Sequence, residues 1–66
     1  MSVARITEIT SESNKNFETA IDNAIERANE TLDQIEGAWV KDMKVTVKDG
    51  KVDKYRVTLK VTFVLK

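Results

Sequence analysis

The sequence predicts an α+β fold in which one helix packs across one face of a three-stranded antiparallel sheet, in the order β-α-β-β. Three observations indicate this fold: a central apolar stripe at helical spacing, two later stretches of alternating apolar and polar residues, and an opening stretch rich in β-branched side chains. With 66 residues, the chain is expected to form a single domain that spans residues 1–66.

The opening stretch predicts the first strand and the start of the helix. Residues 3–10, VARITEIT, are rich in β-branched side chains and favour a strand. The polar stretch SESNKN at 11–16 then offers several residues that commonly cap a helix N-terminus. Ser13, Asn14 and Asn16 are all suitable caps, and the sequence does not choose among them.

The helix is the clearest element of the pattern. Apolar residues recur at steps that place them on one side of a helix, and charged or amide side chains fill the other side. The apolar stripe comprises Phe17, Ala20, Ile21, Ala24, Ile25, Ala28, Leu32 and Ile35. Gly37 follows soon after, where a helix often ends in the left-handed conformation, so Gly37 is predicted to be the C-cap.

Residues 39–48 and 55–65 alternate in polarity and predict two strands joined by a turn at Asp49-Gly50. A two-residue loop would set odd positions opposite even ones and split the apolar residues between the two faces. A three-residue loop, Lys48-Asp49-Gly50, keeps the apolar residues together and is the predicted register. This register pairs Met43 with Tyr55, Lys41 with Val57, Trp39 with Leu59 and Asp42 with Arg56. It also places Trp39 on the face that the helix covers.

The composition argues against several classes of function. The chain has no Cys and no His, so it lacks the commonest zinc ligands and the commonest general base. It also lacks a Gly-rich phosphate loop and a nucleophile motif. Carboxylates on the predicted helix, such as Glu26 and Glu30, are typical of a hydrated face. We therefore expect that the protein is not an enzyme.

Charge and hydropathy bear on the partners. The 11 Lys and Arg residues balance the 11 Asp and Glu residues, so the net charge gives no general attraction to nucleic acid or to an anionic membrane. No apolar run is long enough for a signal peptide or a membrane span, so we expect a soluble, cytoplasmic protein. A domain this small buries only about 60% of its unfolded surface. Without disulfides or thiolate metal sites, oligomerisation is the expected source of further stability.

The whole chain resembles the dodecin family. The stretches SVARITEI and FETAIDNAIERANETL are similar to the opening strand and the helix of that family. The closing stretch DGKVDKYRVTLKVTFVL carries the most specific motifs, which are DGKV, Y-x-V-T-L-K-V and F-x-L. The resemblance implies β-α-β-β subunits that assemble into hollow homododecamers. It also implies that flavin, either riboflavin or FMN, binds at subunit interfaces and is stored or quenched there.

The resemblance also implies which residues contact the flavin. In flavin-binding members, a Trp directly after the helix stacks on the isoalloxazine ring; this column holds Gly37 here, and the tryptophan lies two residues later, at Trp39. A Gln that pairs with the polar edge of the ring precedes VTLKV, and this column holds Arg56. Gln both donates and accepts hydrogen bonds, whereas Arg only donates, so Arg56 favours oxygens or an anionic group. The candidate flavin-binding residues are Trp39, Arg56, Gly37 and Asp42.

Each of these residues also has a structural interpretation. Trp39 has three possible roles. It is packed in the core beneath Ile35 and Leu32, or it is a subunit contact, or it is a platform for ring stacking. Arg56 is either an ion-pair partner of Asp42 or of a neighbouring subunit, or it is a ligand contact. The alternative function is therefore a structural dodecin shell that does not bind flavin.

Two further ligands stay open at this point. Some dodecins are associated with calcium, but the carboxylates of Asp42, Asp49 and Asp53 lack the spacing of an EF-hand loop. Several basic residues suit either a solvated surface or the phosphate of a flavin nucleotide or coenzyme A. These residues are Arg5, Lys51, Lys54, Lys60 and Lys66.

Overall fold

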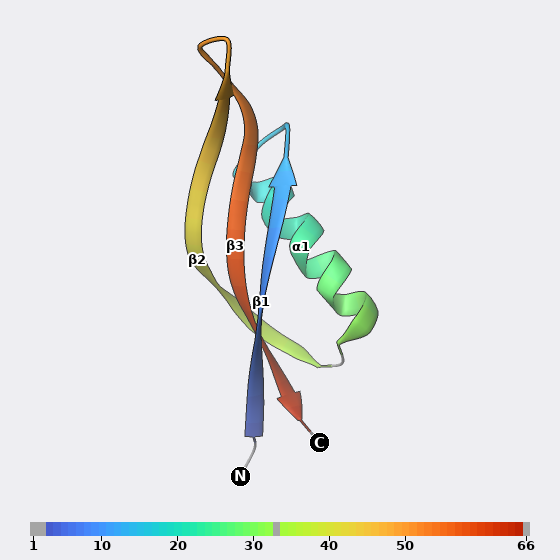
Figure 1. The fold of residues 1–66 in the computed structure, drawn as a ribbon. Helices are drawn as coiled ribbons and strands as arrows, with labels where there is room; N and C mark the ends of the chain where they lie inside the picture. Colours follow the sequence, from blue (N-terminus) through green and yellow to red (C-terminus); the bar gives the residue numbers. More distant parts are fainter. Residues whose placement is uncertain (1–2, 33, 66) are drawn as a thin grey trace.

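The computed structural model of the chain describes residues 3–32 and 34–65, so Lys66 lies outside the described residues. The elements in chain order are β1 (Val3–Ser13), α1 (Phe17–Thr31), β2 (Ile35–Lys48) and β3 (Lys51–Leu65). The strands form an antiparallel sheet in the order β1-β3-β2. Helix α1 lies across one face of this sheet (Figure 1). The predicted α+β fold with β-α-β-β order is therefore confirmed.

Asn16 caps the start of α1. Its side-chain Oδ1 accepts a hydrogen bond from the backbone N–H of Thr19 at 2.7 Å, which satisfies one of the free donors of the first helical turn. Ser13 has a different role, because its Oγ accepts from the backbone N–H of Lys15 at 3.0 Å. Strand β1 continues to Ser13, beyond the predicted end at residue 10, because residues 11–13 pair with β3.

The helix ends earlier than the apolar stripe predicts. Helix α1 stops at Thr31, and Leu32 already has an extended backbone, with φ of −112° and ψ of 134°. The left-handed residue that follows is Gln34, with φ of 54°. Gly37 lies inside β2, so its prediction as the C-cap is wrong. The physical reason is that Ile35 pairs with Phe63 in the sheet and does not continue the helix.

The core lies between α1 and the central strand β3. Alternate residues of β3 are buried, namely Val57, Leu59, Val61 and Phe63. The helix meets them with Ala20, Ala24 and Ala28, and these small side chains allow its backbone to lie close to the sheet. Ile9 of β1 and Ile35 and Val40 of β2 pack around this cluster. The alternation predicted for residues 55–65 is thus confirmed.

The register of the β2–β3 hairpin differs from the prediction. Lys48 pairs with Lys51, so the loop has the two residues Asp49 and Gly50. Both have positive φ, 53° and 75°, as expected for a type I′ turn, whose twist matches that of the flanking strands. The pattern of apolar residues is restored within β3, where a register shift leaves Asp53 without a partner in β2. Beyond the shift Val45 pairs with Tyr55 and Met43 with Val57, so the predicted pairing of Met43 with Tyr55 is wrong.

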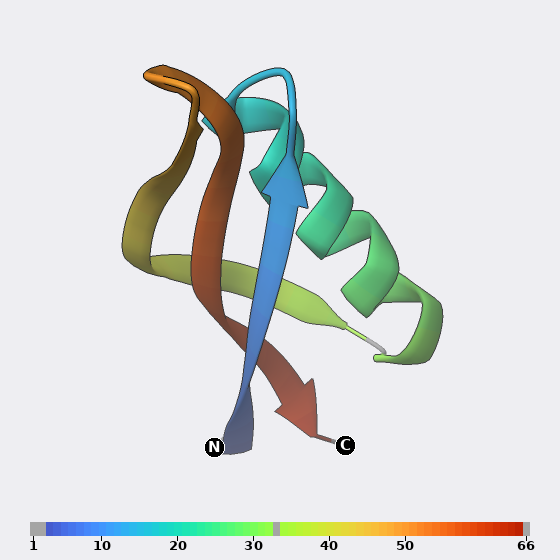
Figure 2. The ribbon, with the colours of Figure 1, turned by 45° about the horizontal axis from the view of Figure 1, so that its top comes forward.

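A second bulge, at Lys41 between Val40 and Asp42, changes which residues of β2 share a face. Trp39 pairs with Lys60 and Asp42 with Thr58, so the predicted pairings of Trp39 with Leu59, of Lys41 with Val57 and of Asp42 with Arg56 are wrong. Figure 2 shows β2 bending sharply along its length. Because Lys60 alternates with the buried Leu59 and Val61, Trp39 points away from the helix.

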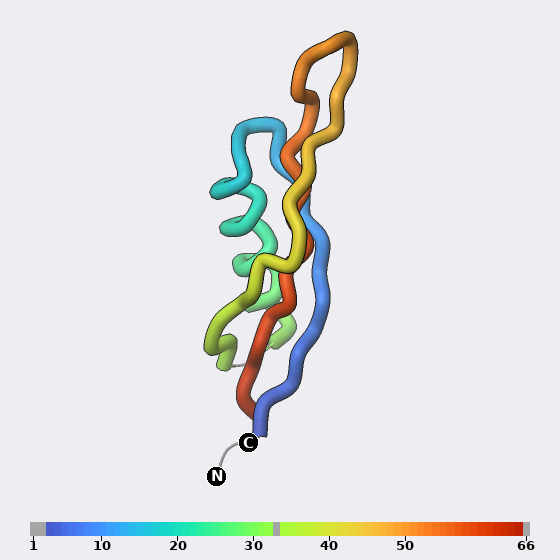
Figure 3. The backbone as a smooth tube through the Cα atoms, turned by 90° about the vertical axis from the view of Figure 1, so that its left-hand side faces the viewer, coloured from blue at the N-terminus to red at the C-terminus, as the bar shows by residue number. Residues whose placement is uncertain are grey.

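Helix α1 covers only one side of the sheet, as the edge view shows (Figure 3). We call the other side the open face. Its residues are Ala4, Ile6, Glu8, Thr10 and Glu12 of β1, Gly37, Trp39, Asp42 and Lys44 of β2, and Arg56, Thr58, Lys60, Thr62 and Val64 of β3. This assignment follows from the register and from the alternation of side chains along each strand.

The hairpin projects beyond the helix (Figure 1). On its helix-side face, four exposed apolar residues form what we call the hairpin patch: Met43, Val45, Val47 and Val52. The molecule is elongated, with extents of 51 × 19 × 13 Å. Its accessible surface is 5026 Å², whereas a compact monomer of 7.5 kDa exposes about 4,250 Å². The single chain thus exposes more surface than a compact protein of its mass usually does.

Candidate ligand-binding site

Trp39 is the most exposed aromatic side chain on the open face. Its exposed fraction is 63%, so the interpretation of Trp39 as core beneath Ile35 and Leu32 is wrong for the single chain. Its side chain lies on the same face as position 37, since no register shift separates Gly37 from Trp39. A Cβ added at Gly37 would meet no atom within 4 Å, so the surface beside Trp39 is open. The indole is therefore accessible to a flat ring.

Lys60 lies against the Trp39 indole and links it to a pair of charged side chains. The Lys60 ammonium lies 5.3 Å from the centroid of the Trp39 ring, which is within the range of a cation–π contact. On the other side of Lys60, Glu8 of β1 pairs with it in the sheet and accepts a hydrogen bond from Lys41 Nζ at 3.1 Å. This arrangement leaves Trp39 with one ring face occupied by a cation, so a stacking ligand would use the other face.

Arg56 bonds to Glu12 and not to Asp42. Glu12 lies directly opposite Arg56 in the sheet. Its Oε1 accepts hydrogen bonds from Nη2 of Arg56 and, at 2.8 Å, from Nε. The other carboxylate oxygen, Oε2, lies 3.5 Å from Lys54 Nζ. The guanidinium is thus held in one orientation, which favours specific contacts with a planar partner.

These contacts keep Glu12 ionised. The hydrogen bond from Arg56 holds the pKa of the Glu12 carboxyl below its ordinary value of 4.5. Desolvation opposes this change, and the charges of Arg56 and Lys54 reinforce it. At neutral pH Glu12 is therefore a carboxylate that only accepts hydrogen bonds.

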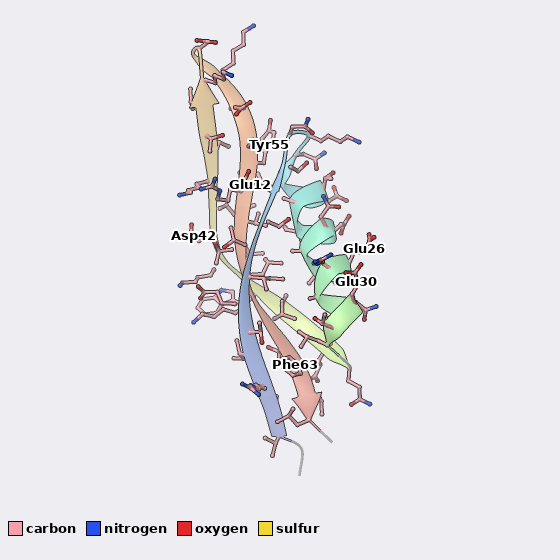
Figure 4. All side chains as sticks on the ribbon, turned by 45° about the vertical axis from the view of Figure 1, so that its right-hand side comes forward. Glu12, Glu26, Glu30, Asp42, Tyr55 and Phe63 are labelled. Atoms are coloured by element: carbon pink, nitrogen blue, oxygen red, sulfur yellow. The ribbon has the colours of Figure 1, made fainter. Side chains whose placement is uncertain are left out.

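Of the remaining candidates, Asp42 lies between Trp39 and Arg56 along the open face, whereas Gly37 lies beyond Trp39, opposite Thr62. Asp42 pairs with Thr58, whose hydroxyl lies 3.3 Å from that of Thr10. Figure 4 shows Asp42 on β2 and Glu12 on β1, with β3 between them. Asp42 does not contact Arg56, which the bulge at Lys41 and the register explain, because the residue opposite Arg56 on β2 is Lys44.

The structure brings Trp39 and Arg56 to the same face but not to the same point. Lys60, the partner of Trp39, lies four residues along β3 from Arg56, which corresponds to roughly 13 Å at 3.3 Å per residue. The two side chains therefore mark two separate parts of the open face.

Three further features of the described surface bear on other kinds of site. Within residues 3–32 and 34–65, no group of three or more His, Cys, Asp and Glu side chains is arranged to hold a metal ion. Glu26 and Glu30 lie on the exposed side of α1 (Figure 4), and Glu30 pairs with Arg27 at 3.2 Å. A groove of 390 Å³ runs between β1 and α1, and it contains none of the candidate residues. No helix in the described part of the chain is long and apolar enough to cross a membrane.

Glu12 is the residue that sequence reasoning missed. The pattern ended the first strand at residue 10 and left Glu12 in a polar connection, so it had no assigned neighbour. The register of β1 on β3 places it opposite Arg56. The signal that would have found it is the run of alternating side chains Glu8, Thr10 and Glu12, which continues the strand into the polar stretch.

Comparison with known proteins identifies the family of this chain. The Dodecin family model matches residues 3–66. The solved dodecin of Streptomyces coelicolor is 31% identical, with a TM-score of 0.93, and the match covers 98% of this chain and 93% of that one. A mutant T. thermophilus dodecin is 32% identical, with a TM-score of 0.94, and the match covers 100% of this chain and 98% of that one.

A third solved relative is described by its binding of calcium. The calcium dodecin of Mycobacterium tuberculosis, described as a calcium-chelating immunodominant antigen with a novel calcium-binding site, is 32% identical with a TM-score of 0.84. The match covers 98% of this chain and 93% of that one. A comparison with curated protein sequences found no significant match.

Proposed function

Because this chain belongs to the dodecin family, we propose that it is a non-enzymatic homo-oligomer, a dodecameric shell that binds and stores a flavin or a related flat ligand at its subunit interfaces. The ligand class is riboflavin or FMN, and the expected location is the cytoplasm. The observation that carries the proposal is the exposed indole of Trp39, on the same face as the oriented guanidinium of Arg56.

The side chains present fit a flavin. The isoalloxazine ring is flat and apolar over most of its area, which suits stacking on an exposed indole. One edge of the ring carries oxygens and an N–H, which suits a polar group of the kind found at Arg56 and Glu12. The ammonium of Lys60 beside Trp39 suits a ligand that carries negative charge, such as the phosphate of FMN.

The shape of the subunit supports self-association. Its accessible surface exceeds that of a compact monomer of its mass, and the hairpin patch is exposed. Trp39 and Arg56 lie roughly 13 Å apart along the sheet, and in a site between copies the Trp39 of one copy and the Arg56 of another would contact one ring. The same assembly would cover apolar surface and complete the ligand site.

The experiment compares Trp39→Ala with Trp39→Phe in a riboflavin titration that follows the quenching of flavin fluorescence. We expect Trp39→Ala to weaken riboflavin binding by at least about tenfold, since stacking on an aromatic side chain contributes roughly 0.5–1.5 kcal/mol beyond the burial of area. Trp39→Phe should keep most of the affinity because it retains an aromatic face. Unchanged affinity in Trp39→Ala would contradict the proposed role.

The alternative is a dodecin shell that does not bind flavin, and two observations favour it. Lys60 already occupies one face of Trp39, and Glu12 already neutralises Arg56. In this alternative Trp39 packs between subunits, and Trp39→Ala would destabilise the assembly by roughly 3–5 kcal/mol. Size-exclusion chromatography and urea unfolding of Trp39→Ala distinguish the two functions, since a ligand platform predicts an intact assembly of nearly unchanged stability.

A further inference from the structure

The proposed flavin site leaves one requirement of the ligand unmet by Arg56. On the basis of that proposed function, we propose that Glu12 determines specificity for flavin: together with Arg56 and Lys54 it forms a donor–acceptor–donor edge that recognises the imide edge of the isoalloxazine ring. Glu12 would accept the hydrogen bond of the ring N–H that lies between the two carbonyl groups. Arg56 and Lys54 would donate to the two carbonyl oxygens.

The geometry of Glu12 leaves an acceptor available. Both hydrogen bonds from Arg56 go to Oε1. The other oxygen, Oε2, is 3.5 Å from Lys54 Nζ, which is long for a hydrogen bond. A carboxylate has about four lone-pair sites, so Oε2 retains the capacity to accept. Glu12 contacts Arg56 through one oxygen and Lys54 through the other, and it therefore lies between two donors.

The donors beside Glu12 also keep unused capacity. Arg56 has five N–H groups, and within residues 3–32 and 34–65 its hydrogen bonds go only to Glu12. The Nη1 group of Arg56 is therefore available for a carbonyl oxygen. Lys54 has three rotatable N–H donors on a flexible side chain, so it can turn toward a second oxygen.

The surroundings allow a ligand edge to approach. Glu12 and Lys54 line a shallow hollow of 310 Å³, together with Ser13 and Asn14. The side chains of Arg56 and Glu12 are 34% and 33% exposed, so they are partly shielded from water but remain accessible. Partial shielding strengthens a charge-assisted hydrogen bond to a ligand.

The arrangement explains how a residue that only donates can serve a ring edge that also needs an acceptor. An imide edge presents a carbonyl oxygen, an N–H and a second carbonyl oxygen in a row. Arg56 alone could donate to the oxygens, but it has no acceptor for the N–H. The carboxylate of Glu12 supplies the missing acceptor, and its lowered pKa keeps it ionised at neutral pH. A ligand that carries a methyl group in place of the N–H would set an apolar group against the Glu12 carboxylate and lose the charge-assisted hydrogen bond, so discrimination should be measurable.

The test compares riboflavin with riboflavin methylated at the imide nitrogen, by quenching of flavin fluorescence in the intact assembly. The wild type should prefer riboflavin by about tenfold or more, as expected for a hydrogen bond to a charged group. In Glu12→Thr this preference should fall to nearly one, because the shorter side chain does not reach the ring edge. Threonine favours strands, so Glu12→Thr keeps the propensity of β1.

Glu8→Thr is the matched control. Glu8 is on the same strand and the same face, it also forms a surface ion pair, and it lies opposite Lys60 rather than Arg56. This variant should keep the preference of the wild type. If Glu12→Thr does not assemble, Glu12→Ala is measured in its place, with the same expected loss of preference.

The outcomes separate this inference from the function on which it rests. If the wild type binds neither flavin, the proposed function fails and the inference fails with it. If riboflavin binds but the methylated ligand binds equally well, or if the preference survives in Glu12→Thr, the role of Glu12 is wrong while flavin binding stands. Loss of the preference in Glu12→Thr, but not in Glu8→Thr, supports the inference.

Discussion

The ammonium of Lys60 lies 5.3 Å from the centroid of the Trp39 ring, and these two residues are direct neighbours across β2 and β3. The contact places a positive charge on one face of the side chain that we propose to stack on the ligand. A cation at an exposed aromatic ring contributes roughly 0.5–1 kcal/mol. The charge of Lys60 is therefore more important for the choice of ligand than for stability.

Lys60→Met should reduce the preference for FMN over riboflavin. The substitution removes a charge next to the ring but keeps a similar volume, so neutral riboflavin should bind within about fivefold of the wild type, as the size of a cation–π contact indicates. Binding of FMN should weaken further, and this extra loss should disappear at high salt. The measurement is a pair of fluorescence titrations at low and high ionic strength. Lys51→Met, at the hairpin turn, is the control and should keep the wild-type preference for FMN over riboflavin. An unchanged preference in Lys60→Met would contradict the prediction.

Acid should remove a contribution of Glu12 to stability. Its pKa in the folded chain is lower than the ordinary value of 4.5, so folding favours the ionised form. The contribution is complete above pH 4.5 and is lost as the pH falls through the lower folded-state pKa. Urea unfolding of wild type and Glu12→Gln should show a difference in stability at neutral pH that shrinks at an acidic pH below 4.5. An equal difference at both pH values would contradict this account.

Replacing the helix cap should weaken the fold by a modest amount. Asn16→Ala removes the acceptor for the Thr19 N–H and should cost about 1 kcal/mol of unfolding free energy. Asn14→Ala changes the same residue type two positions earlier, at an exposed site that does not cap the helix, and should cost less than about 0.5 kcal/mol. Urea denaturation measures both. Equal effects of the two substitutions would show that Asn16 is not the functional cap.

A charge in the hairpin patch should break the assembly. Val47 is exposed in the single subunit, so Val47→Glu should leave the fold of that subunit intact. If the hairpin patch is covered by a neighbouring copy, a buried and unpaired carboxylate would oppose association. Light scattering coupled to size-exclusion chromatography should then show a smaller particle. Lys48→Glu, next to it in β2, is the control for a change of charge alone, and an assembly of normal size in Val47→Glu would exclude this surface as a contact.

The element types were predictable, but the register of the hairpin was not. The alternation in residues 55–65 and the stripe from Phe17 to Ala28 follow from the need to bury one face of each element, and the structure confirms both. The Asp49-Gly50 pair favours a two-residue turn, which would pair odd positions of β2 with even positions of β3. The apolar pattern instead favours a register in which odd positions pair with odd ones. The protein satisfies both preferences with bulges, which single-strand patterns do not reveal.

The candidate site was harder to predict because it depends on that register. Trp39 was assigned to the helix-covered face by strict alternation along residues 39–48, and one bulge at Lys41 reverses the assignment. Glu12 became part of the site only through its pairing with Arg56, 44 residues away in the chain. The sequence identified Trp39 and Arg56 through residue type and family resemblance, but long-range pairing decided their neighbours.

The most direct test of the central proposal is a riboflavin titration of the wild-type protein, at a particle size established by light scattering, that follows the quenching of flavin fluorescence. We predict strong, saturable quenching by an assembly larger than a monomer, with a fixed ratio of flavin to subunit. An intact assembly that leaves flavin fluorescence unchanged would contradict the account and would favour a shell in which Lys60 and Glu12 occupy the positions of a ligand.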